Sequence, residues 1–151
     1  MHVTRTRVRY GETDQMGVVY HANYLVYFEI GRTELIRKLG RSYAAMETEG
    51  WRLPVTEASL RYRGSARYDD ELVITTSISK VTGVRIRFEY TVTREEDGDG
   101  EKDQRLIVEG HTVLACVDEH GIPKRLPREV HQALEALSDG NATRDRNPSP
   151  R

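Results

Sequence analysis

Four side chains capable of acid, base or hydrogen-bonding chemistry crowd a short stretch near the start of the chain. Glu12, Asp14, His21 and Asn23 all lie within residues 10–24. A carboxylate can take a proton from water or attack a carbonyl directly. A helix N-terminus presents unpaired N–H groups and a partial positive charge, which stabilise an oxyanion. A carboxylate beside such a helix end is therefore sufficient for acyl transfer without a serine, a cysteine or a metal ion.

The same residues also have structural interpretations. Asp14 can cap a turn, and His21 can be a loop histidine whose ring is satisfied by its neighbours. Gly11 and Gly17 allow the tight or left-handed backbone that such a loop needs. Composition and spacing alone favour these structural roles.

The element that must position this stretch is a helix predicted over residues 23–40. Apolar residues share one helical stripe, and the first half of the segment is apolar on nearly all sides. The stripe contains Leu25, Phe28, Leu35, Ile36 and Leu39. Asn23 is the expected N-cap and Gly40 the expected stop. We expect this helix to be buried on most sides, as inside a curved sheet.

Alternation of apolar and polar residues predicts strands on both sides of the helix. A short strand is expected at Val8 and Tyr10. Four antiparallel strands are expected after the helix, at residues 58–62, 72–78, 84–92 and 106–117, the last bent at its glycine. An acidic loop over residues 95–104 should join the last two strands, and a short helix over residues 127–137 should close the unit. These elements predict an α+β domain with one helix packed on an antiparallel sheet.

Composition limits the possible partners. The chain has 151 residues with 23 Lys+Arg against 24 Asp+Glu, so its formal net charge is −1. This balance gives no electrostatic case for nucleic acid or an anionic membrane. The single cysteine, Cys116, excludes an internal disulfide and a CxxC metal site, and it is expected to be a buried small hydrophobe. No metal is expected in the acidic loop, because Lys102 stands where a calcium loop needs glycine.

The longest uncharged stretch and the two ends of the chain indicate its localisation and its domain organisation. The longest uncharged stretch, residues 15–28, is too short and polar to span a membrane, and no secretory signal pattern is visible. A cytoplasmic protein is therefore expected. Residues 138–151 contain Ala142 as their single apolar residue and are expected to form a disordered tail. A single domain over residues 1–137 remains.

The run over residues 10–24, YGETDQMGVVYHANY, resembles the hotdog-fold acyl-CoA thioesterases. It is similar to the 4-hydroxybenzoyl-CoA thioesterase-like group, and in particular to the branch associated with the Tol-Pal system. The similarity continues through Phe28 and Glu29 on the helix and through residues 66–72, and it covers residues 3–137. It implies a hotdog fold, in which a five-stranded antiparallel sheet wraps around one long central helix. It also implies hydrolysis of an acyl-CoA thioester to a carboxylate and free CoA.

The resemblance implies roles for three residues of this run. Asp14 matches the catalytic aspartate, acting as a base toward water or as a nucleophile. The backbone N–H of His21 matches the donor that polarises the thioester carbonyl, and its side chain matches the histidine of the Tol-Pal branch. Tyr10 matches a substrate-site position in that branch, although a core or rim tyrosine fits equally well. Glu12 departs from the family pattern, which usually has aspartate there.

The resemblance leaves the substrate class open. Glu29 matches the helix carboxylate that binds the ring hydroxyl in the hydroxybenzoyl enzymes, or it pairs structurally with Arg32 or Arg67. An aroyl-CoA thioesterase, acting on 4-hydroxybenzoyl- or dihydroxynaphthoyl-CoA, is therefore an alternative. A non-catalytic acyl-CoA-binding module is another, although the presence of Asp14 argues against it.

The resemblance also implies a way to hold CoA and to assemble. Arg63 and Arg85 are our candidates for the CoA phosphates, among a wider set of Arg61, Arg87, Lys124 and Arg125. Any single one of these basic residues can equally well be an ordinary solvent-exposed residue on the face of a strand. No cofactor is expected, since CoA is part of the substrate. Hotdog domains pair with the site between subunits, so a homodimer or homotetramer is expected.

Overall fold

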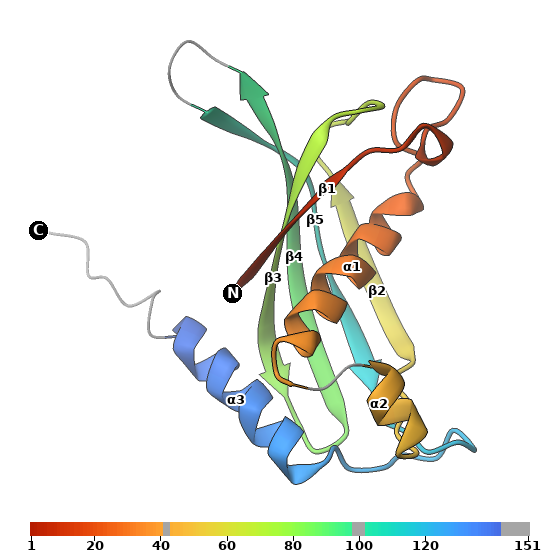
Figure 1. The fold of residues 1–151 in the computed structure, drawn as a ribbon, viewed down its shortest axis with the longest axis vertical. Helices are drawn as coiled ribbons and strands as arrows, with labels where there is room; N and C mark the ends of the chain where they lie inside the picture. Colours follow the sequence, from red (N-terminus) through yellow and green to blue (C-terminus); the bar gives the residue numbers. More distant parts are fainter. Residues whose placement is uncertain (41–42, 98–101, 143–151) are drawn as a thin grey trace, which may run out of the picture.

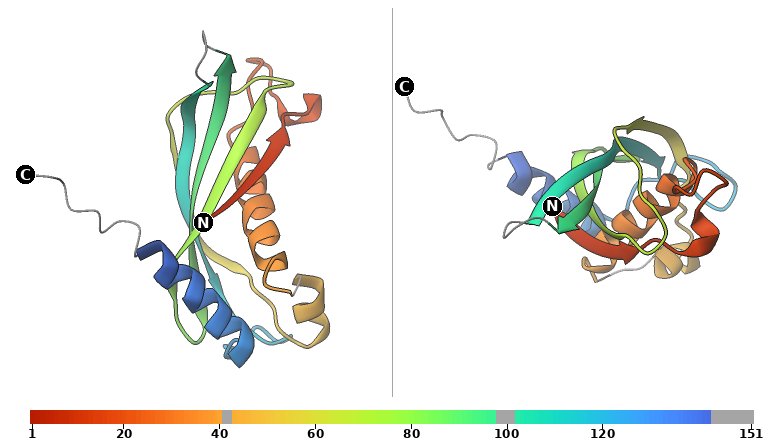
Figure 2. Two further views of the ribbon diagram at one scale, coloured as in Figure 1. Left: turned by 60° about the vertical axis from the view of Figure 1, so that its left-hand side comes forward. Right: turned by 90° about the horizontal axis from the view of Figure 1, so that it is seen from above.

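A computed structural model describes residues 1–40, 43–97 and 102–142 (Figure 1). Within these residues one antiparallel sheet has five strands in the order β1-β3-β4-β5-β2. The strands are β1 (His2–Arg7), β2 (Val55–Tyr62), β3 (Glu71–Val81), β4 (Arg85–Asp97) and β5 (Lys102–Ala115). The helices are α1 (Asn23–Arg37), α2 (Tyr43–Thr48) and α3 (Arg128–Ala142). The sheet curves around α1, which confirms the predicted α+β architecture (Figure 2).

Close packing of α1 on the sheet depends on Gly31. A Cβ at this position would lie 2.3 Å from Thr76 Oγ1 and 2.8 Å from Ile74 Cγ2, so only glycine lets the helix approach β3 so closely. One turn earlier, the Phe28 ring stacks on Tyr90 of β4 with 4.2 Å between ring centroids. These contacts fix the helix against the middle of the sheet.

The predicted burial of α1 is wrong on one side. Leu25 and Val26 are 39% and 45% exposed, although the helix buries Tyr24, Tyr27, Phe28, Gly31, Leu35 and Ile36. Asn23 is not the N-cap either, because Ala22 occupies that position and makes no side-chain cap bond. The helix itself ends at Arg37, three residues before the expected stop, and the turn that follows it reaches Gly40, whose φ is +78°. One apolar side of the helix is therefore left uncovered by the described residues of this chain.

Two strand boundaries differ from the prediction. The first strand ends at Arg7, and Tyr10 begins a single 3-10 turn (Tyr10–Glu12). The acidic segment is mostly strand, since Glu95 pairs with Gln104 and Asp97 with Lys102. Apolar alternation marks only strands with one buried face, so it could not reveal a hairpin end that extends past the core. Residues 98–101 of the expected loop lie outside the described residues.

The C-terminal helix is longer than predicted. α3 extends to Ala142, past the expected domain boundary at Leu137, and it packs on β3 through buried Val130 and Leu134. The rest of the expected tail, residues 143–151, lies outside the described residues. The short α2 was not predicted, and its Met46 is buried in the core. Within the described part of the chain, no helix is long and apolar enough to cross a membrane.

Candidate active site

The loop before α1 folds back on itself as a small hairpin. An isolated antiparallel bridge joins Thr13 and Val19, and the Asp14 N–H donates to the Val18 carbonyl at 2.9 Å. Gly17 closes the turn, with its N–H 2.9 Å from the Asp14 carbonyl and a φ of +78°. This left-handed backbone favours glycine, as the sequence predicted. The turn holds Asp14 in one place relative to the helix.

The Asp14 side chain has a structural partner and one free oxygen. Oδ1 accepts the Met16 N–H at 2.9 Å, so the carboxylate caps its own turn. Within the described residues, Oδ2 receives no hydrogen bond. The side chain is half-buried, and the pattern leaves one carboxylate oxygen available to a water or a substrate. The structural and chemical interpretations of Asp14 are therefore compatible.

Glu12 holds this loop against α1. Its Oε1 accepts the Arg9 N–H at 2.8 Å and the Tyr27 hydroxyl at 3.1 Å. Its carbonyl accepts the Asn23 side-chain amide at 2.8 Å and the Tyr20 N–H at 2.9 Å. Burial is the main cause that raises the pKa of Tyr27, and the negative charge of Glu12 is the second. The Tyr27 hydroxyl therefore keeps its proton and donates it to the hydrogen bond with Glu12. The sequence showed only that glutamate replaces the usual aspartate, and it did not reveal this role.

His21 lies two residues before α1 and is exposed. Its carbonyl accepts the Tyr62 hydroxyl at 3.0 Å, and its ring lies 4.5 Å from the Tyr20 ring between centroids. Its own N–H has no acceptor among the described residues. The Val19 N–H also donates to the Ala66 carbonyl at 2.8 Å, which fixes the loop to the segment before β3. A rigid, unpaired donor therefore lies at the entrance of α1 on the same loop as Asp14.

Two other candidates lie at this end of the molecule. Tyr10 is 78% exposed and stands edge-on to Tyr68, which excludes a core role and places it at the rim. Arg63 follows Tyr62, whose hydroxyl contacts the His21 carbonyl, but it is ion-paired with Glu109 at 3.0 Å. The structure thus brings Tyr10, Asp14 and His21 onto one loop, with Arg63 at the adjoining end of β2.

Glu29 and Arg85 lie away from this loop. Glu29 is exposed further along α1, and among the described residues it pairs with neither Arg32 nor Arg67. Arg85 begins β4 at the opposite end of the sheet (Figure 1). There it lines a hollow of about 260 Å³ together with Lys80 and Arg87. One chain therefore does not place Arg85 beside Asp14.

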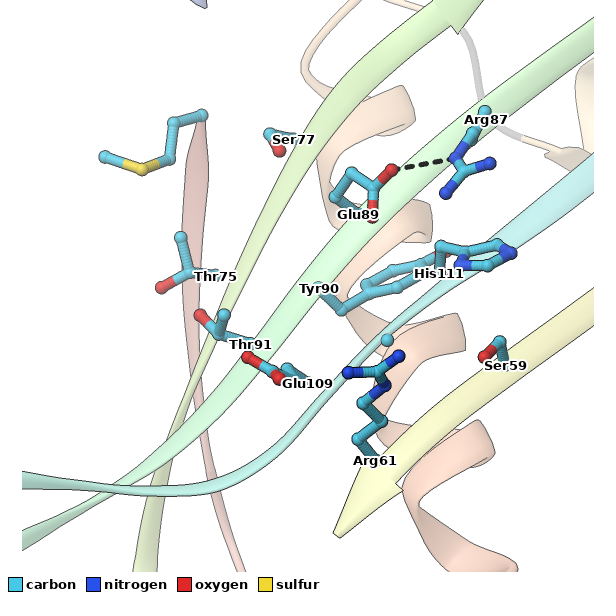
Figure 3. Close-up of a pocket in the computed structure, with 12 residues that line it drawn as sticks. Ser59, Arg61, Thr75, Ser77, Arg87, Glu89, Tyr90, Thr91, Glu109 and His111 are labelled. Atoms are coloured by element: carbon cyan, nitrogen blue, oxygen red, sulfur yellow. Dashed lines mark hydrogen bonds and ion pairs between the residues drawn. The ribbon is translucent and has the colours of Figure 1, made fainter. Parts of the chain in front are cut away.

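A hollow of about 610 Å³ lies on the face of the sheet opposite α1 (Figure 3), and no residue of the Asp14 loop lines it. Its charged side chains are balanced, since Arg61 and Arg87 face Glu89 and Glu109 there. Arg87 donates to Glu89 at 2.8 Å, so this arginine has an anionic partner already. The size of the hollow does not make it the reactive site, because it holds no uncommitted carboxylate near a helix end.

Cys116 takes no part in such a site. It is fully buried, and burial raises the pKa of its thiol to about 11, which keeps it protonated and inert at neutral pH. This confirms the prediction that it is a buried small hydrophobe. In the described part of the chain, no group of three or more His, Cys, Asp or Glu side chains could hold a metal ion.

Comparison with known proteins identifies the family of this chain. Residues 8–134 match the family model of the thioesterase-like superfamily. The chain is 36% identical to the acyl-CoA thioesterase YbgC of Haemophilus influenzae over 87% of this chain and 92% of that protein. It is 33% identical to the acyl-CoA thioester hydrolase YbgC of Escherichia coli O6:H1 over 82% of this chain and 88% of that protein. The crystal structure of a DHNA-CoA thioesterase from Staphylococcus aureus has a TM-score of 0.80 and 36% identity, covering 95% of this chain and 92% of that one. The chain therefore belongs to the thioesterase-like superfamily and has its hotdog fold.

Proposed function

We propose that this protein hydrolyses acyl-CoA thioesters to a carboxylate and free CoA. The observation that carries the proposal is Asp14, which keeps one carboxylate oxygen without a hydrogen bond from the described residues, on a hydrogen-bonded loop that also carries the unpaired His21 N–H. The activities of the YbgC relatives support the same reaction. The proposal needs no metal and no cofactor, since CoA enters as part of the substrate.

The reaction uses the two groups in complementary roles. Asp14 takes a proton from a water molecule whose oxygen attacks the thioester carbonyl carbon, or it attacks that carbon itself and forms an anhydride that water then cleaves. The His21 N–H and the positive end of α1 stabilise the oxyanion that forms. Collapse of the tetrahedral intermediate breaks the C–S bond and releases the CoA thiolate. The exposed His21 imidazole lies on the same loop, and in this proposal it protonates that sulfur.

The replacement Asp14→Asn tests the proposal. Asparagine keeps an oxygen that accepts the Met16 N–H, so the turn should survive while the base or nucleophile is lost. We expect thioester turnover to fall by about 10²- to 10⁴-fold with an unchanged melting temperature. Glu119→Gln, which changes an exposed carboxylate on a distant loop, is the matched control. Near-normal turnover of the Asp14→Asn variant would refute the assignment.

We also propose that the working form is at least a homodimer, joined along β2. This strand is an edge of the sheet, and Val55 and Tyr62 on it are exposed, as are Leu25 and Val26 of α1. A second copy would cover these apolar side chains and the open strand edge. It would also bring basic residues of a second chain, Arg85 among them, toward the CoA phosphates. Light-scattering mass in solution tests this, and a stable monomer that is fully active would contradict it.

The aroyl-CoA alternative is favoured by one observation. The Glu29 carboxylate has no ion-pair partner among the described residues, so it is free to accept a hydrogen bond from a ring hydroxyl. The 36% identity to the DHNA-CoA thioesterase supports the same alternative. Thiol release measured in parallel on alkanoyl- and aroyl-CoA esters distinguishes the two. Tight acyl-CoA binding without any thiol release would favour a non-catalytic binding module.

Cytoplasmic localisation remains part of this proposal. Acyl-CoA esters are metabolites of the cell interior, and Cys116 is a free thiol, as is usual in a reducing compartment.

A further inference from the structure

A second hollow, of about 290 Å³, lies beside the C-terminal half of α1. Its lining residues come from α1, from α2 and from the segment that leads into β2. These elements lie side by side at the C-terminal end of α1 (Figure 1). Its lining combines three apolar and three charged side chains: Met46, Trp51, Leu53, Glu29, Arg32 and Glu47. We call this the α1–α2 hollow. The proposed hydrolysis and CoA contacts do not use it, and of its lining residues only Glu29 enters the aroyl-CoA alternative.

The apolar wall of the α1–α2 hollow is fixed in place. The Trp51 Nε1–H donates to the Arg125 carbonyl at 2.8 Å, and Lys124 Nζ lies 4.1 Å from the centroid of the indole ring. Met46 beside it is buried in the core. A preformed apolar wall binds a hydrocarbon chain without having to order flexible side chains first.

Arg32 is the unusual member of the hollow. Its Nε is buried and has no hydrogen-bond partner within the described residues. Neither Glu29 nor Glu47 forms an ion pair with it there. Burial raises the pKa of Tyr90, and the charge and hydrogen bonding of Arg32 oppose that rise, so part of the guanidinium already interacts with the Tyr90 hydroxyl. A buried N–H without an acceptor is unfavourable, so an oxygen atom supplied from the hollow would be bound strongly.

The position of Arg32 along α1 sets the length of a group that could reach it. Arg32 is nine residues beyond Asn23, which corresponds to about 13 Å along the axis. Helical side chains lean toward the N-terminus, so the guanidinium lies roughly 8–13 Å from the oxyanion donor. An extended chain covers about 1.2 Å per bond, so this distance corresponds to roughly seven to eleven bonds.

We propose that Arg32 is a specificity-determining residue that binds an oxygen at the far end of the acyl group. The preferred substrates are then acyl-CoA esters of about eight carbons that end in a hydroxyl group. A hydroxyl suits the α1–α2 hollow because it accepts from Arg32 and can donate to Glu29, whereas the carboxylates of Glu29 and Glu47 would repel a terminal carboxylate. The proposal rests on the proposed thioesterase function and specifies the substrate class of that site.

The test compares pairs of substrates that differ only in the terminal hydroxyl. For the full-length protein, kcat/KM is measured on octanoyl-CoA and ω-hydroxyoctanoyl-CoA, and on butyryl-CoA and ω-hydroxybutyryl-CoA. We expect a preference of about 10- to 100-fold for the hydroxylated member of the long pair and none in the short pair, which cannot reach Arg32. Arg32→Met should remove the preference, and Arg32→Lys should restore part of it.

Two further variants control for the loss of any arginine from α1 and for misfolding of Arg32→Met. Arg37→Met removes an exposed arginine from the same helix, ion-paired with Glu34, and should leave the preference intact. Glu29→Gln keeps Arg32 and should weaken the preference even if Arg32→Met fails to fold. If the wild-type protein hydrolyses none of the four esters, the proposed function fails. If it hydrolyses them but the long-pair preference is absent, or is the same in wild type, Arg32→Met and Glu29→Gln, this inference is wrong while the proposed function stands.

Discussion

Replacing Glu12 by alanine should loosen the loop that carries Asp14 without altering Asp14 itself. The Glu12 side chain is only 14% exposed, and its Oε1 accepts both the Arg9 N–H at 2.8 Å and the Tyr27 hydroxyl at 3.1 Å. Alanine removes this acceptor and leaves the hydroxyl of fully buried Tyr27 unpaired. The variant therefore isolates the support of the reactive loop from its chemistry.

The expected cost follows from these contacts. Leaving a buried donor unsatisfied costs about 1–3 kcal/mol, and losing a hydrogen bond to a charged acceptor costs a similar amount. Because the two losses share one oxygen, we expect the free energy of unfolding to fall by about 2–4 kcal/mol. For a domain of this size that lowers the melting temperature by roughly 6–12 °C. A loop that holds Asp14 less firmly should also reduce kcat by about 10- to 100-fold.

A double-mutant cycle with Tyr27→Phe measures the contact itself. Urea unfolding of the wild type, Glu12→Ala, Tyr27→Phe and the double variant should give a coupling energy of about 0.5–1.5 kcal/mol. Glu12→Gln keeps an oxygen acceptor and should lose about 1 kcal/mol at most. Glu119→Ala, at an exposed position, is the control for loss of a carboxylate. Additive effects of Glu12→Ala and Tyr27→Phe, or a Glu12→Ala variant as stable and active as the wild type, would refute this reasoning.

Two further predictions concern the core. Gly110→Ala would place a Cβ 2.1 Å from the Ser59 carbonyl and 3.0 Å from the Phe28 ring, so it should separate β5 from β2 and cost at least about 2 kcal/mol in urea unfolding. A fully stable variant would contradict this. Burial raises the pKa of Tyr24 from 10.0 to about 12, so the folded state holds this proton more tightly than the unfolded state. Stability should then fall by up to about 1.4 kcal/mol per unit as the pH rises from 10 to 12, and Tyr24→Phe should flatten that fall in urea titrations.

Much of the fold could be predicted because apolar periodicity records burial. The alternation around Phe88 and Tyr90 predicted β4. Both side chains are buried, and the Tyr90 ring stacks on Phe28 of α1. Apolar periodicity gave wrong predictions where a strand continues beyond the core and where an apolar side chain is exposed. Glu95 and Glu96 pair with Gln104 and Asp103 in the hairpin, and these polar residues show no apolar alternation, whereas Leu25 is apolar but 39% exposed among the described residues.

The candidate site was predictable to a similar degree. Residue types and the family resemblance pointed to Asp14 and His21, and the structure places both on one loop before α1. The contact between Tyr62 and the His21 carbonyl could not be predicted, because it joins residues 41 positions apart and depends on the register of β2. Arg85 was grouped with the site by its charge alone, and the sheet places it at the other end.

The sequence by itself determined the chemistry available to this protein: a carboxylate, a histidine and a helix start within fifteen residues, in a chain with one inert cysteine. These features are local, and local spacing is what a linear sequence contains. The tertiary structure decided which groups are free to act. It satisfied one oxygen of Asp14 and left the other without a hydrogen bond from the described residues, used Glu12 to hold the loop, and buried the Arg32 Nε without a hydrogen-bond partner among those residues, beside an apolar wall. Those outcomes depend on which strands and helices meet, and contacts between distant segments are established only when the whole chain has folded.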